Sequence, residues 1–303
     1  MLLVDTKTSC LFWNSLYTLH YIEMFRSVLE RGLLMVRIQP YETKKLFVTV
    51  KTYPTPSATY IETTCVSGIA DDGHWIRIHP IRFRSLEEDN RFPRYSWIQV
   101  RANKATRDPR PESYHVDENT IQVLSHPPTT NAWQERREIV EPMLSQSVED
   151  LRDQQANNHT SLGVIRPKEI TSFSIEEADK EWSPKQLAKL DQQDLFALKQ
   201  GARLEKIPFD FCYDFICDDS RCHGHHMKVL DWEVAQSYRK WSRGATRDEW
   251  ERKMKEMYDY RVRHSYDSLF FLGTLSNHPT TWTIGGIFFA PKNRPEPQQP
   301  TLW

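Results

Sequence analysis

Residues 60–83 read YIETTCVSGIADDGHWIRIHPIRF, and this stretch decides the first half of the fold. Two runs rich in β-branched and aromatic residues, 60–70 and 75–83, flank the triplet Asp71-Asp72-Gly73. An Asp-Gly pair favours the tight turn of a β-hairpin because glycine adopts a positive φ without steric cost. The stretch therefore predicts two antiparallel strands.

Further short runs of β-forming residues surround this hairpin. Residues 46–53 predict a strand that ends at Pro54, and residues 97–100 and 120–124 predict two more. Short strands at this spacing indicate a small barrel or a curved sheet. Residues 162–165 and 170–175 also look extended, and we expect them to return and complete this first sheet.

Helical spacing begins near Asn131, where Trp133, Val140 and Leu144 fall on one face. Ser147 and Asp150 are typical of the start of another short helix. Ser183-Pro184 predicts the beginning of a longer helix, with Phe196 on its apolar side and an end at Gly201.

The C-terminal half shows strands as well as helices. Residues 209–216 alternate with period two and present an aromatic face, and residues 227–230 can form the return strand. Asp231 can cap one helix, and Thr246 with Glu249 forms a capping box for another. Residues 268–272 and 282–289 are apolar strands.

These elements predict an α+β protein with two domains. We expect a possible extension at 1–34, a β-rich domain at 35–180, an α+β domain with a Cys/His zinc loop at 181–292 and a disordered tail at 293–303. The composition agrees, because 303 residues with 39% hydrophobic content can build a core. The net charge is −1, so no global field indicates a nucleic acid or membrane partner. No apolar run approaches the roughly 20 residues of a membrane span, and we expect a cytoplasmic protein without a membrane partner.

A cluster of metal-binding residue types follows the aromatic strand. The chain carries five cysteines, and the sequence Cys212-x4-Cys217-x4-Cys222-His223-Gly224-His225-His226 gathers three of them beside three histidines. A tight turn can place such side chains around a tetrahedral Zn²⁺. We predict a structural zinc held by Cys217, Cys222 and His225, with Cys212 as fourth ligand. Three histidines and one acid could replace Cys212 as the fourth ligand: His226, His223, His278 and Asp219.

Two other interpretations of this cluster stay open. Buried structural cysteines beside exposed loop histidines would explain the same letters. Alternatively, an open metal site could activate water, with His226, Asp231 and Glu233 as candidate catalytic residues. Against catalysis, Asp231 suits a helix cap and no H-E-x-x-H motif occurs.

A local excess of arginine interleaved with aromatic residues lies between residues 75 and 111. Arginine forks suit phosphates and aromatic rings suit bases, so the pattern predicts binding of single-stranded nucleic acid. The candidate residues are five arginines and one tryptophan: Arg77, Arg82, Arg84, Arg94, Arg101 and Trp97. Half-buried strands with solvated arginines would give the same pattern.

Three functions follow as hypotheses. The first is an intracellular zinc protein that binds nucleic acid through the Arg/aromatic residues. The second is a metal-dependent nuclease or hydrolase centred on the Cys/His/Asp loop. The third is a regulatory or scaffold protein with a structural zinc only.

Overall fold

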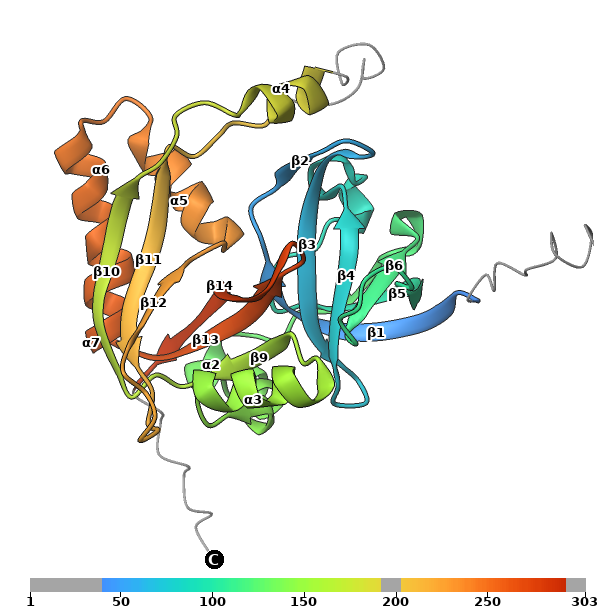
Figure 1. Ribbon diagram of the computed structural model, residues 1–303, viewed down its shortest axis with the longest axis horizontal. Coiled ribbons are helices and arrows are strands. Elements are labelled where there is room, and N and C mark those ends of the chain that lie inside the picture. Colours follow the sequence, from blue (N-terminus) through green and yellow to red (C-terminus); the bar gives the residue numbers. More distant parts are fainter. Residues whose placement is uncertain (1–39, 192–202, 293–303) are drawn as a thin grey trace, which may run out of the picture. The chain divides into compact units, whose positions relative to one another are not determined.

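Five strands in the first part of the chain close into a β-barrel (Figure 1). The computed structural model describes residues 40–191 and 203–292. The barrel strands are β1 (Glu42–Lys51), β3 (Ile61–Ala70), β4 (Trp75–Ile81), β6 (Ser113–Val116) and β5 (Trp97–Lys104), in that spatial order. The barrel closes because β5 pairs with β1. Only the contact between β4 and β6 is parallel among these pairs. The expected barrel is confirmed.

The hairpin that the sequence predicts forms strands β3 and β4 of this barrel. Ile69 pairs with Trp75 across the turn, and Gly73 adopts a φ of +81°. Two short strands extend the sheet, β2 (Thr55–Ser57) beside β3 and β7 (Gln122–Ser125) beside β5. The barrel interior is filled by aliphatic side chains, including Leu46, Val48, Val66, Ile78, Ile98 and Val100.

A four-stranded sheet follows the barrel in the chain. Its order is β14 (His278–Pro291), β13 (Tyr266–Leu275), β9 (Leu162–Ile165) and β8 (Leu144–Ser145). The expectation that 162–165 and 170–175 complete the first sheet is wrong. Residues 162–165 form β9 of this four-stranded sheet, and residues 170–175 lie in a separate three-stranded sheet. All four residues of β9 are buried, so this strand needs neighbours on both edges, and β8 and β13 supply them.

The remaining strands form a three-stranded sheet. It contains β10 (Glu169–Glu177), β11 (Phe209–Ile216) and β12 (His225–Lys228), with β11 in the centre. The aromatic face of β11 packs with the helices: Phe211 and Tyr213 belong to the same core as Tyr238 and Trp250. Figure 1 shows α5 and α6 beside this sheet.

The helices mostly begin where their caps predict. The α-helices are α2 (Thr130–Val140), α3 (Val148–Asn158), α4 (Pro184–Asp191), α5 (Trp232–Ser242), α6 (Arg247–Met254) and α7 (Val262–His264). A π-helical turn, η5 (Lys255–Arg261), joins α6 to α7, and the 3₁₀ turns are η1 (Phe83–Ser85), η2 (Glu88–Asn90), η3 (Glu118–Thr120) and η4 (Glu141–Met143). Ser147, Asp231 and the Thr246/Glu249 capping box act as predicted.

Two helix predictions need correction or lie outside the described residues. Leu144 does not share a helical face with Trp133, because it lies in β8, and Trp133 itself has a positive φ of 64°. Phe196 and Gly201 lie outside the described residues, as do the expected extension at 1–34 and the tail at 293–303.

The barrel and the later strands share a core. Described residues after Pro40 belong to one compact unit. Phe47 of β1 lies in one apolar cluster with Phe271 of β13 and Phe288 of β14. Tyr95 donates a hydrogen bond from its hydroxyl to the carbonyl of Ile287 at 3.0 Å, which fixes the β14 backbone against the barrel.

Candidate metal centre

A hairpin positions the three predicted ligands. Cys217 directly follows β11, and His225 begins β12 opposite Phe215. The connecting loop turns at Gly224, whose φ of +98° lies in the region that side chains with a Cβ rarely adopt. This turn returns the chain so that His225 comes back beside Cys217 and Cys222.

The fourth residue comes from a distant helix. Glu149 lies in the first turn of α3, whose N-cap is Ser147. Its Oε1 atom lies 3.1 Å from Nε2 of His225, and its side chain is only 10% exposed. We call Glu149, Cys217, Cys222 and His225 the Cys/His/Glu cluster.

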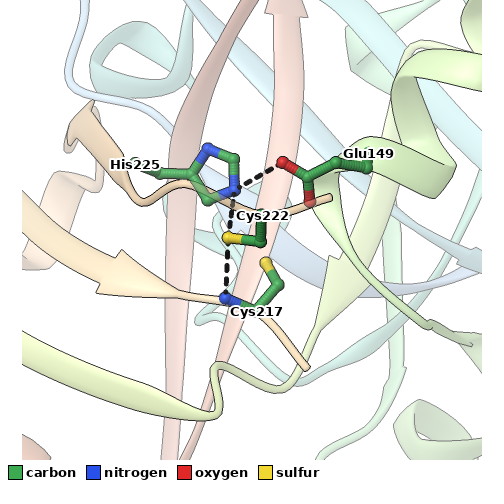
Figure 2. Close-up of side chains that lie close together, drawn as sticks. All are labelled: Glu149, Cys217, Cys222 and His225. Atoms are coloured by element: carbon green, nitrogen blue, oxygen red, sulfur yellow. Dashed lines mark hydrogen bonds and ion pairs between the residues drawn. The ribbon is translucent and has the colours of Figure 1, made fainter. Parts of the chain in front are cut away.

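Figure 2 shows the four side chains of this cluster converging from α3 and the hairpin. One ligand atom from each residue lies within 4.8 Å of all the others. Sγ of Cys222 is 3.3 Å from Nε2 of His225. Zinc bonds of about 2.0 to 2.3 Å in a tetrahedron separate ligand atoms by roughly 3.3 to 3.8 Å. The cluster is therefore compatible with a bound metal ion.

Two further features of the cluster are compatible with a bound cation. The backbone N–H of Cys217 donates a hydrogen bond to Sγ of Cys222 at 3.1 Å. Oε2 of Glu149 is buried and has no hydrogen-bond partner among the described residues. A buried carboxylate oxygen without a partner is costly, and a metal ion would satisfy it.

Burial controls the protonation of the cluster without metal. It raises the pKa of the Cys217 thiol to about 12, although the backbone N–H of Val148 lowers it in part. Burial also lowers the pKa of His225, although the Glu149 carboxylate opposes this. The imidazole is therefore neutral and ready to coordinate at neutral pH, whereas the Cys217 thiol must lose its proton to a metal.

A second set of contacts attaches the loop to α3. Ser147 donates from Oγ to Oδ2 of Asp219 at 2.7 Å, and Arg221 pairs with Asp153 of α3 at 2.6 Å. Hydrogen bonds from Arg221 and Ser147 lower the pKa of Asp219. Asp219, predicted as a replacement ligand, is engaged in these contacts instead.

Cys212 lies outside the Cys/His/Glu cluster. It groups with Glu176 and His226, whose side chains are exposed. Cys212 is five residues before Cys217 on a strand, and an odd separation places two side chains on opposite faces. Among the other proposed replacements, His223 and His278 are exposed and neither belongs to the cluster.

Sequence reasoning did not identify Glu149. The only local signal was the predicted helix start at Ser147 and Asp150. An acidic residue in the first turn of a helix is expected there because it interacts favourably with the helix N-terminus, so it does not indicate a metal ligand. Its role depends on a contact with His225, 76 positions later in the printed sequence.

The three catalytic candidates lie in two different places. His226 neighbours His225 on β12, so it points to the opposite face, where Nδ1 lies 2.7 Å from Oδ1 of Asp214. Asp231 and Glu233 are at the N-terminus of α5 and both pair with Arg94. Asp231 also accepts a hydrogen bond from the backbone N–H of Ile287 at 3.1 Å. Its carboxylate is thus used in structural contacts.

The Arg/aromatic residues divide into buried and accessible ones. Arg77 and Arg94 are only 2% and 4% exposed, so they do not form part of a surface. Arg82 is exposed and pairs with Glu118, and the half-buried Arg84 pairs with Glu62.

Trp97 is half-buried against Phe47, with ring centroids 5.6 Å apart. Arg101 is exposed and lies over the ring of Tyr41 at 5.7 Å. Any nucleic-acid contact would therefore rest on residues other than Arg77 and Arg94.

The described helices include none whose length and apolar character would suit a membrane crossing. No curated protein matches the chain in sequence. Two models of domains of unknown function do match. DUF8758 covers residues 42–142, and DUF8757 covers residues 144–302. The first match contains the barrel, and the second contains the whole Cys/His/Glu cluster. Since the second match spans more than half of the 303 residues, the chain belongs to the DUF8757 family.

Proposed function

We propose that this protein binds one Zn²⁺ ion through Glu149, Cys217, Cys222 and His225. The observation that carries the proposal is the convergence of these four ligand atoms within 4.8 Å, together with the unpartnered Oε2 of Glu149. Two sulfur ligands, one imidazole and one carboxylate form a donor set that suits zinc better than magnesium or calcium, which prefer oxygen.

The proposed role of the ion is structural. Four protein ligands complete a tetrahedron and leave no position for a substrate or water. The ion would attach the loop between β11 and β12 to the first turn of α3. Two contacts already join these segments: the hydrogen bond from Ser147 to Asp219 and the ion pair between Arg221 and Asp153. Metal binding would then contribute directly to the free energy of folding.

Elemental analysis of the purified protein tests this proposal. We expect about one zinc per chain, and we expect its loss in Cys217→Ser, Cys222→Ser and Glu149→Gln. Cys212→Ser is the matched control, because Cys212 is a cysteine of the same hairpin that lies in another group. A protein without zinc, or one that keeps zinc in the three ligand variants, would contradict the proposal.

A chelator distinguishes a structural ion from a catalytic one. With a structural zinc, removal of the ion by a chelator lowers the midpoint of thermal unfolding, and added zinc restores it. Restoration of an activity with no change in unfolding would instead favour the nuclease or hydrolase hypothesis. Nucleic-acid binding stays a prediction of the sequence, and titration of labelled oligonucleotides at increasing salt tests it.

A further inference from the structure

A large cavity lies where the barrel meets β13 and β14. Its volume is about 740 Å³, which is in the range of small-molecule sites. Residues of β1, β3 and β4 line one side, and residues of β13 and β14 line another. None of the residues of the Cys/His/Glu cluster takes part, so this cavity is a separate feature of the molecule.

The charged residues that line the cavity are mostly cationic. They are three arginines and one aspartate, Arg77, Arg107, Arg110 and Asp108, so three positive charges minus one negative charge leave an excess of two. His79 and His115 also line it and add donors or acceptors without a charge when neutral. A concave site with this balance attracts anions.

Arg77 is a buried cation at the wall of this cavity. Its guanidinium is almost completely buried, and its hydrogen bonds go to neutral groups: Oγ of Ser113 at 3.3 Å, and Oγ and the carbonyl of Ser161 at 2.8 and 3.0 Å. Among the described residues it forms no direct ion pair. Glu112 compensates the charge of Arg77 only indirectly, through Ser161, which donates from Oγ to Oε2 of Glu112 at 2.7 Å. A buried cation without a direct counterion is costly, and an anion in the cavity would reduce that cost.

The other cationic residues border the same space. Arg110 is paired with Asp108 at 2.6 Å and donates to the carbonyl of Thr274 at 2.9 Å. Arg107 is exposed and has no ion-pair partner in the described part of the chain. Thr274 lines the cavity, and its buried Oγ1 has no hydrogen-bond partner among the described residues. A hydroxyl and two guanidinium groups are thus present without a carboxylate bound directly to them.

Apolar side chains also line the cavity: Val50, Leu162, Leu230 and Leu272. We propose that this cavity binds a small molecule that carries an oxyanion group, a phosphate or a carboxylate, with the anion at Arg77 and Arg107 and the body of the molecule against the apolar residues. Guanidinium groups bind both oxyanions through paired N–H donors.

Calorimetric titration with inorganic phosphate and with acetate tests the proposal, at constant ionic strength with chloride as the reference anion. We expect phosphate or acetate to bind with one site per chain, and the stronger of the two identifies the group. Arg107→Gln should weaken binding about tenfold, the effect of losing one charged hydrogen bond. Arg101→Gln is the matched control, because Arg101 is also an exposed arginine but does not line the cavity.

Alkylation of Cys65 locates the bound anion. Cys65 is half-buried and lines the cavity, so the bound anion should slow its reaction with iodoacetamide, followed by mass spectrometry of its peptide. Arg107→Gln and Arg101→Gln each replace an exposed side chain, and urea unfolding checks that both variants fold. Failure of both anions to bind beyond chloride would overturn the proposal. So would unchanged binding in Arg107→Gln together with unchanged alkylation of Cys65.

Discussion

Arg94 donates a hydrogen bond from Nη1 to Oδ2 of Asp231 over 2.5 Å, and this pair connects the barrel to the N-terminus of α5. Both side chains are almost fully buried, at 3% and 2% exposure. Removing one partner of a buried ion pair leaves the other charge uncompensated, which is more damaging than losing an exposed pair.

We therefore predict that Asp231→Asn lowers the free energy of unfolding by at most about 3 kcal/mol, the lower end of the cost of breaking a buried ion pair, because Glu233 still pairs with Arg94. Asparagine can still cap α5 with its one oxygen, so the loss reports the ion pair together with the hydrogen bond from the backbone N–H of Ile287. Glu233→Gln is the control, because the Glu233 side chain is 45% exposed and its loss should cost under about 1 kcal/mol. Urea unfolding followed by circular dichroism measures both. Equal stability of the Asp231 variant and the wild type would show that this carboxylate is not structural.

Ser147 has two roles, and the second concerns the proposed metal. It caps α3 by accepting from the backbone N–H of Asp150 at 3.0 Å, and it donates to Asp219 in the loop. Ser147→Ala should cost about 1 kcal/mol in stability and weaken zinc binding roughly tenfold, since outer contacts orient the ligands. Competition with a chromophoric chelator gives the zinc affinity.

The matched control for Ser147 is Thr246→Ala. Thr246 caps α6 in a capping box with Glu249, to which its hydroxyl donates a hydrogen bond at 3.0 Å, and it does not belong to the cluster. This variant should lose a similar amount of stability and keep the zinc affinity of the wild type. A loss of zinc affinity in both variants would mean that general destabilisation, and not the Ser147 contact, determines metal binding.

Zinc uptake by the metal-free protein should release protons. Burial holds the pKa of the Cys217 thiol at about 12, so at pH 7 this group is protonated and must lose its proton on coordination. His225 adds little, because burial lowers its pKa and the ring is already neutral.

Calorimetric titration of zinc in buffers of different ionisation enthalpy counts the protons. We expect proton release on zinc uptake by the wild type, and neither zinc uptake nor proton release by Cys217→Ala, which lacks a ligand. Zinc affinity should fall as the pH is lowered, because protons compete with the metal for its ligands. A proton count that is the same in the variant would exclude Cys217 as a ligand.

Lys51 gives a pH dependence of stability that is independent of metal. It is 8% exposed, and burial lowers its pKa from 10.5 to about 8, with Glu233 partly opposing the shift. Between these values the unfolded chain binds the proton more strongly than the folded chain does. Stability should therefore rise as the pH is raised from about 8 to 10.5.

The gain has an upper limit of about 3 kcal/mol, from 1.36 kcal/mol per pKa unit. The ring of Phe83, 4.1 Å from the ammonium, reduces it by stabilising the charged form. Lys51→Met should remove the rise, whereas Lys45→Met, on the same strand with an exposed side chain, should retain it. Urea unfolding at pH 7.5 and 9.5 compares the three proteins. A rise of equal size in Lys51→Met would assign it to another group.

Local patterns predicted most of the elements. The Asp-Gly turn after Ala70, the alternation from Phe209 to Ile216 and the caps Ser147, Asp231 and Thr246 each correspond to an observed element. These signals succeed because turn chemistry, strand alternation and capping depend on residues a few positions apart. Helix α2 was harder, since three of its first residues have a positive φ that no local pattern signals.

The sequence by itself determined that a barrel-forming hairpin lies near the start and that Cys217, Cys222 and His225 share one turn. Only the tertiary structure decided that Glu149 joins them and that Arg77 and Arg94 are buried. The physical reason is distance along the chain: periodicity tells which side of a strand a residue occupies, but it does not tell which distant element covers that side. That choice is made when packed helices and strands bury their apolar faces together, and it also places a cationic cavity between elements that the sequence keeps far apart.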